Sequence, residues 1–74
     1  MPNGWIVELR GRGAGQTLVL SQHFAVAIED EAAALSAVVP FGKSLFDVRI
    51  TAKTAISETA LRALVVRPGG VRRH

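Results

Sequence analysis

The fold is decided by one stretch, Trp5-Ile-Val-Glu-Leu-Arg-Gly-Arg-Gly-Ala-Gly-Gln-Thr-Leu-Val-Leu20. Its first six residues alternate between the two sides of an extended chain, with Trp5, Val7 and Leu9 on one side. A period of two with aromatic and β-branched residues predicts a half-buried strand. Extended character resumes at residues 17–20, after a link rich in glycine. Two extended runs around such a link predict an antiparallel hairpin.

Residues 21–28 allow two interpretations. In the first, apolar residues keep recurring at every second position, so the strand extends to Ile28 and Asp30 caps a helix over residues 31–39. In the second, Ser21 caps a single helix that ends at the same place. We favour the strand followed by a helix, because the sequence Phe-Ala-Val-Ala-Ile alternates and β-branched residues prefer strands. In both interpretations the proline and glycine that follow end the helix.

A third strand is expected at residues 45–52, where Phe46, Val48 and Ile50 alternate with polar residues and are expected to face inward. A second helix is expected over about residues 58–65, with an apolar stripe along one side. The order β-β-α-β-α predicts the class α+β. We expect a small single domain, with a three-stranded, mostly antiparallel sheet and two helices packed on one face.

The surplus of positive charge lies at the C-terminal end of the sequence. The chain has nine Lys and Arg against six Asp and Glu, and removing Arg67, Arg72 and Arg73 leaves six against six. We therefore assign residues 1–66 to the domain and residues 67–74 to a basic C-terminal tail. Such a tail either contacts phosphates weakly or is a frayed, solubilising terminus.

Length and composition favour association between copies of the chain. A chain of 74 residues has a thin stability margin, and the absence of cysteine excludes disulfides and thiolate metal sites. With 49% hydrophobic residues, a homo-oligomer, most simply a dimer, is expected. The sequence shows neither a signal peptide nor a membrane span, so we expect a cytoplasmic protein without membrane contact. Frequent Ala, Gly, Val and Arg are typical of a bacterial protein.

Motifs that would carry catalysis or hold a cofactor are incomplete in this sequence. The glycine-rich link has Gln16 where a dinucleotide-binding loop needs its third glycine, so a hairpin turn explains it better. His23 and Ser21 are about 7 Å apart on a strand, too far for a direct hydrogen bond. The consecutive acids at residues 29–31 suit a helix cap better than a cation site. We therefore predict no enzyme, no cofactor, and no catalytic, cofactor-binding or metal-binding residue.

Two functions remain for such a domain. The first is a non-enzymatic protein-interaction or regulatory module that self-associates through a sheet edge or helix face, with Trp5 as candidate interface anchor. The second is a weak nucleic-acid-binding module that uses basic residues of the loop and the tail. Its candidate contacts are Arg10, Arg12, Arg67, Arg72 and Arg73, supported by Lys43 and Lys53. The same arginines would also suit an acidic protein partner.

Overall fold

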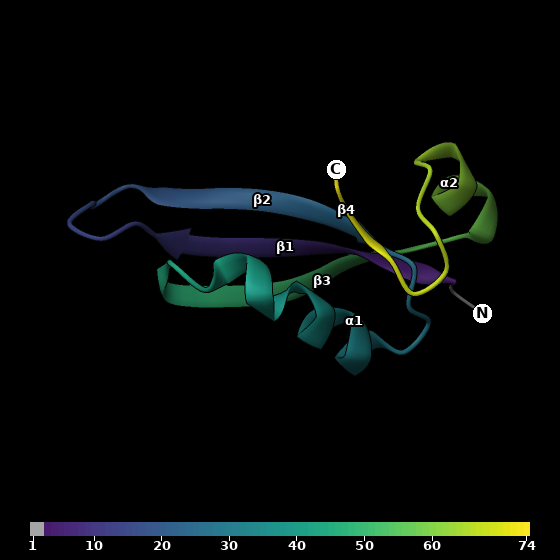
Figure 1. Cartoon of the computed structure of the whole chain (residues 1–74), viewed down its shortest axis with the longest axis horizontal. Helices are drawn as coiled ribbons and strands as arrows, with labels where there is room; N and C mark the ends of the chain where they lie inside the picture. The colour runs from purple at the N-terminus through teal and green to yellow at the C-terminus, as the bar shows by residue number, and fades with distance from the viewer. Residues whose placement is uncertain (1–2) are drawn as a thin grey trace.

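A computed structural model describes residues 3–74. This part of the chain forms a four-stranded antiparallel sheet and two α-helices in the order β-β-α-β-α-β. The elements are β1 (Gly4–Arg12), β2 (Val19–Val26), α1 (Glu31–Val38), the 3₁₀-helix η1 (Val39–Gly42), β3 (Phe46–Ile56), α2 (Glu58–Ala63) and β4 (Val71–Arg73). The strands lie in the order β3-β1-β2-β4, so the β1–β2 hairpin forms the centre of the sheet (Figure 1). The α+β class and the hairpin are confirmed.

The prediction of three strands is wrong, because the described chain has a fourth strand, β4, inside the segment that we assigned to the tail. β4 pairs with β2 and places Val71 opposite Val26. Just before it, the amide of Ala27 donates to the carbonyl of Gly70 (2.9 Å), and the amide of Gly69 donates to the carbonyl of Ala27 (2.8 Å). A strand of three residues is too short to show a period of two, so the sequence carries no local signal for it.

For residues 21–28 the strand is confirmed over the single helix, but it ends two residues before the expected Ile28. β2 continues to Val26, and α1 begins at Glu31. Oδ2 of Asp30 accepts a hydrogen bond from the amide of Ala33 at 2.9 Å, which is the expected N-cap contact. The first turn of η1 contains Pro40, which cannot continue the hydrogen bonds of α1.

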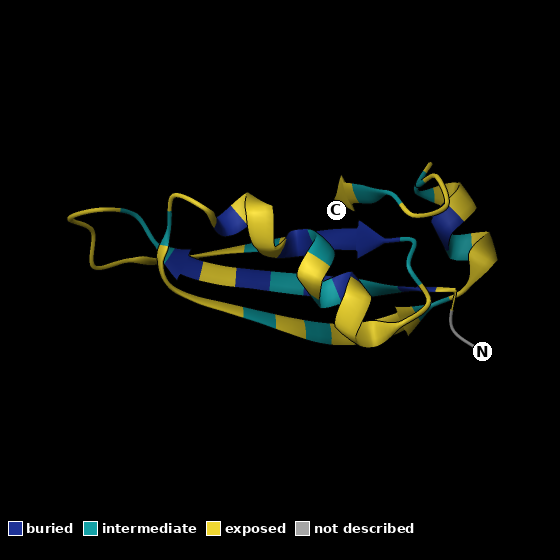
Figure 2. Cartoon of the chain, turned by 60° about the horizontal axis from the view of Figure 1, so that its bottom comes forward, coloured by how far each residue is buried: buried dark blue, intermediate teal, exposed yellow. Residues whose placement is uncertain are grey.

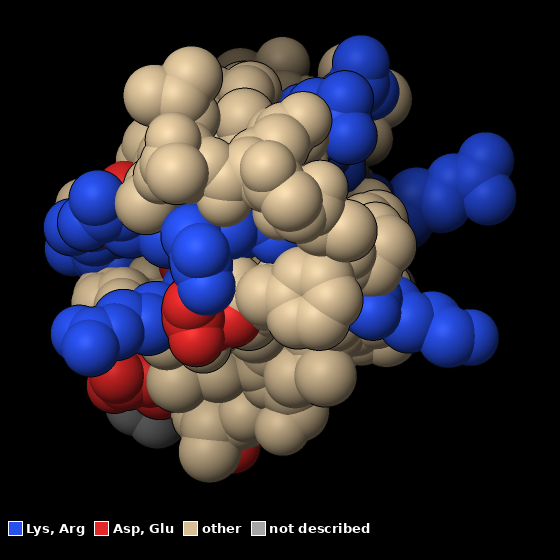
Figure 3. All heavy atoms as spheres, turned by 90° about the vertical axis from the view of Figure 1, so that its left-hand side faces the viewer, with Lys and Arg blue, Asp and Glu red and all other residues tan. Residues whose placement is uncertain are grey.

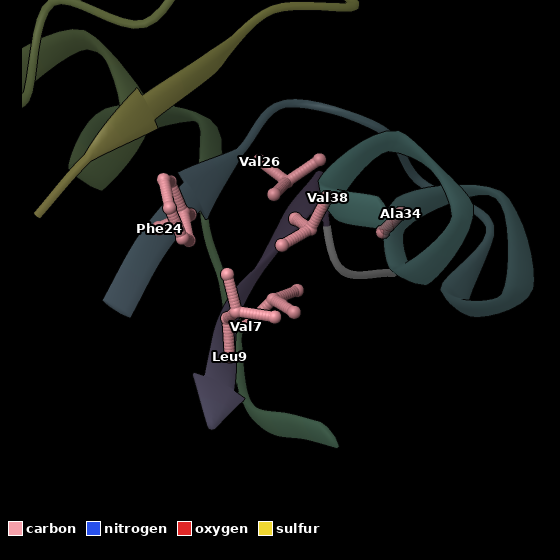
Figure 4. Packing of buried hydrophobic residues seen from close by; sticks show 6 residues of the cluster. All are labelled: Val7, Leu9, Phe24, Val26, Ala34 and Val38. Atoms are coloured by element: carbon pink, nitrogen blue, oxygen red, sulfur yellow. The ribbon is translucent and has the colours of Figure 1, made fainter. Parts of the chain in front are cut away.

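The core lies between the sheet and α1. Its buried residues are Val7, Leu9, Phe24, Val26, Ala34 and Val38. Figure 4 shows them gathered between β1, β2 and α1, and Figure 2 shows the buried stretches along the middle of the sheet. The ring of Phe41 in η1 closes one end of this core, with its centroid 4.8 Å from that of Phe24. Each large side chain buried in this way contributes about 1.5–3 kcal/mol.

The two helices do not share a face of the sheet in the described chain. α1 lies across the sheet, whereas α2 lies beyond the end at which β1 begins (Figures 1 and 2). Leu61, which is buried in α2, packs against the backbone of Gly4, where an added Cβ would lie 3.1 Å from Leu61 Cδ1. The prediction of two helices packed on one face is therefore wrong for α2, which also ends at Ala63 rather than near residue 65.

A β-bulge changes the predicted orientation of Phe46. Between Phe46 and Arg49, β3 has the two residues Asp47 and Val48, where the paired segment of β1 has one. The extra residue reverses the alternation, so Phe46 faces away from α1 while Val48 stays on the α1 side, near Gly42. Phe46 is 55% exposed and Val48 is 37% exposed. The expectation that Phe46 faces inward is wrong, and Val48 is only partly covered.

Candidate functional site on the open sheet face

The strand residues that alternate with the core point away from α1, onto a surface that we call the open face. The pairing register shows which residues are neighbours on the open face, because residues directly opposite each other lie on the same side of a sheet. Arg10 is opposite both Ser21 and Arg49, and Glu8 is opposite His23. The charged residues of the open face are Arg10, Arg12, Arg49, Lys53 and Arg72, with the carboxylates Glu8 and Asp47.

Glu8 organises the middle of the open face. Its side chain is 15% exposed, and its Oε2 accepts a hydrogen bond from Ser21 Oγ at 3.2 Å. Nε2 of His23 lies 3.4 Å from the same oxygen, and Nζ of Lys53 lies 3.7 Å from Oε1. Because the carboxylate stands between the serine and the histidine, the histidine is not placed as a base for the serine hydroxyl. The four side chains therefore form a cluster of polar contacts around Glu8 on the open face.

Three arginines come together at the end of the open face next to the hairpin loop. They surround a hollow of about 300 Å³, which is lined by Arg10, Gly11, Arg12, Val19, Asp47 and Arg49. Asp47 Oδ2 accepts two hydrogen bonds from Arg12, one of them from Nε at 2.8 Å. The backbone of Asp47 has a φ of 52°, in the left-handed region that aspartate tolerates better than most residues. The bulge thus brings a carboxylate to Arg12.

Arg10 and Arg49 are left without a carboxylate. They are direct cross-strand partners in the register, and within residues 3–74 no acidic side chain forms an ion pair with either of them. Both are exposed. Like charges placed directly opposite each other destabilise a sheet. The folded chain therefore carries an unfavourable pair at this position, which an anion would relieve.

The structure separates the five arginines that the sequence singled out. Arg10 and Arg12 line the same hollow, and Arg72 lies further along the open face on β4. Arg73, the next residue of β4, points to the α1 side of the sheet. Arg67 lies in the link between α2 and β4. Only part of the predicted set therefore lies on one surface in the described chain.

Arg49 was missed by the sequence reasoning. Its alternation with Ile50 indicates a solvent-facing residue, but the sequence does not say which strand residue stands beside it. With Arg49 included, five basic side chains and two carboxylates lie on the open face, a surplus of three that equals the net charge of +3 of the whole chain. Figure 3 shows the molecule from the hairpin end, with basic side chains on both flanks and carboxylates beside them at the left and in the centre. In the folded chain, a positive surplus therefore lies on one face of the sheet, whereas the sequence alone places it in the C-terminal segment.

Trp5, the candidate interface anchor, is half-buried. It packs against the core cluster, and its Nε1 donates a hydrogen bond to the carbonyl of Glu29 at 3.0 Å. The indole therefore ties the start of β1 to the segment that leads into α1. Its role in an interface stays a prediction.

Comparison with known proteins returns no relative for this site. No family model matches the chain, and no curated protein or solved structure matches it either. Across residues 3–74, no helix is long and apolar enough to cross a membrane, and no group of three or more His, Asp or Glu side chains is arranged to hold a metal ion.

Proposed function

We propose that this protein is a non-enzymatic binding module whose open face binds the phosphate backbone of nucleic acid. The observation that carries the proposal is the pair Arg10 and Arg49, opposite each other and without a carboxylate partner in the described chain. A phosphate placed between two guanidinium groups removes their repulsion and forms charge-assisted hydrogen bonds with both. Arg72 and Lys53 extend the positive surface along the sheet.

Such binding would be weak, independent of sequence and sensitive to salt. About four phosphate contacts imply an affinity that falls about a hundredfold between 50 and 200 mM salt, because each contact releases counterions. Phosphate contacts fix position but do not read bases, and base reading in duplex DNA needs an element that enters a groove. A sheet face with scattered basic side chains fits the first role.

The test uses two neighbouring arginines of β4 that point to opposite sides of the sheet. Binding of fluorescently labelled oligonucleotides is measured by anisotropy across a salt series, for the wild type, Arg72→Ala and Arg73→Ala. Both variants lose one positive charge, but only Arg72 lies on the open face. We expect Arg72→Ala to weaken binding and to reduce the salt slope by about one, and Arg73→Ala to change little. Equal effects of the two variants, or no binding by the wild type at low salt, would refute the proposal.

Self-association is a second candidate function, favoured by the uncovered edge of β3. β3 is eleven residues long and stands at the end of the strand order, with no partner strand on its outer side in residues 3–74. An unpaired edge is a template for pairing with a second copy. The two register shifts between β1 and β3 oppose this, because bulges twist an edge away from pairing. The mass in solution, measured by light scattering over a concentration series, decides between dimer and monomer.

A further inference from the structure

Phe46 has a position that the packing of the core does not explain. The bulge at Asp47 turns it onto the open face, directly opposite Arg12, where it is 55% exposed. Phe41 is similarly exposed, but its ring packs on Phe24 and closes the core. Within residues 3–74, no aromatic ring pairs with Phe46, and it lies outside the core cluster. An aromatic ring therefore stands beside the arginine-lined hollow with much of its surface in solvent.

We infer that Phe46 and the Arg10–Arg49 pair form a subsite for one nucleotide of a single strand. This subsite rests on the proposed function and specifies its ligand. The base stacks on the ring of Phe46, and the adjoining phosphate lies between the two guanidinium groups. Combining aromatic stacking with a positive track for the backbone is how proteins bind single strands without sequence preference. A duplex keeps its bases stacked inside the helix, so it offers Phe46 no base face.

Asp47 directs the phosphate within the hollow. Its carboxylate binds Arg12, which leaves Arg10 and Arg49 as the two cations of the hollow without an ion pair in the described chain. The same negative charge repels a phosphate from the Arg12 side. A phosphate is therefore expected nearer to Arg10 and Arg49, and the Arg12–Asp47 pair holds the bulge that exposes Phe46.

The experiment compares three labelled probes of equal length: a single strand, a duplex, and a single strand in which the bases are missing and the sugar-phosphate backbone remains. Anisotropy is measured at one low salt concentration for the wild type, Phe46→Leu and Phe46→Tyr. We expect the wild type to bind the single strand at least about fivefold more tightly than the abasic strand, the lower end of the stacking range for one base. Phe46→Leu should remove this difference, and Phe46→Tyr should keep it because the ring is retained.

Each outcome separates the nucleotide subsite from the general proposal. If the single and abasic strands bind equally, or if Phe46→Leu leaves their difference intact, the subsite is refuted while phosphate binding by the open face stands. The same holds if Phe46→Leu weakens binding of the duplex as much as binding of the single strand, because a duplex offers Phe46 no base face. If none of the three probes binds, the proposed function itself fails. Folding of each variant is checked by circular dichroism, and Phe46→Tyr guards against a loss of binding caused by misfolding.

Discussion

The two faces of the sheet are built from the same strands and differ in charge and in the burial of their large side chains. On β2, Phe24 is fully buried under α1 and η1, while its neighbour His23 lies on the open face beside Glu8. Antiparallel sheets commonly pack one face and leave the other in water. The open face here is distinguished by its positive surplus and by the opposed Arg10 and Arg49. One face therefore holds the fold together, and the other carries a charge arrangement that folding does not need.

The largest effect on stability is expected from a substitution on the covered face, the side of the sheet on which α1 packs. Phe24→Ala removes a fully buried ring and should reduce the free energy of unfolding by about 3–5 kcal/mol, through lost burial and the cavity left behind. His23→Ala, one residue away on the open face, should change it by no more than about 0.5 kcal/mol. Urea denaturation followed by circular dichroism measures both. Because a small domain has little stability to lose, Phe24→Leu serves as a milder variant. Similar losses for Phe24→Leu and His23→Ala would contradict the comparison.

A smaller effect is expected at the place where α2 touches the sheet. A Cβ added at Gly4 would lie 2.2 Å from the carbonyl oxygen of Val26 and 3.1 Å from Leu61 Cδ1, so the backbone must move. Gly4→Ala should therefore cost about 1–3 kcal/mol, the usual range for overpacking. At Gly13 an added Cβ meets only the flexible end of Gln16, within 3.2 Å, so Gly13→Ala should be nearly neutral. Equal thermal midpoints for the two variants would contradict the close approach of the Val26 carbonyl and Leu61 to Gly4.

The sequence predicts the covered face better than the open one. Alternation in β1 and β2 identifies Val7, Leu9 and Phe24 as one apolar side, and these residues are in the core. Asp30 is likewise recognised as a helix cap from local signals alone. Such predictions succeed because burial and capping act within a few residues along the chain.

The open face depends on contacts between distant segments. The Arg10–Arg49 pair needs the register between β1 and β3, and the position of Phe46 needs the bulge at Asp47. A single extra residue in a strand reverses every side chain beyond it, and neither the extra residue nor β4 leaves a periodic signal. The candidate site could therefore be predicted only as a set of basic residues.

The smallest effect on stability is expected from removing the repulsion between Arg10 and Arg49 on the open face. Arg49→Gln removes one of the two opposed charges and should raise the free energy of unfolding by a few tenths of a kcal/mol at low ionic strength. The gain should disappear in high salt, where the Debye length shrinks to about 3 Å. Arg49→Lys keeps the charge and should show no gain, and Arg72→Gln, opposite the uncharged Ala25, should show none either.

The same substitution should weaken nucleic-acid binding, so that Arg49→Gln makes the protein more stable and a poorer binder at once. A residue that only supports the fold would lower both properties or leave binding unchanged when replaced. Stability gained at the expense of function is what a site that retains unfavourable charges for a ligand predicts. A loss of stability in Arg49→Gln at low salt, measured from the urea midpoint, would show that Arg49 has a stabilising contact and that its opposition to Arg10 carries no cost.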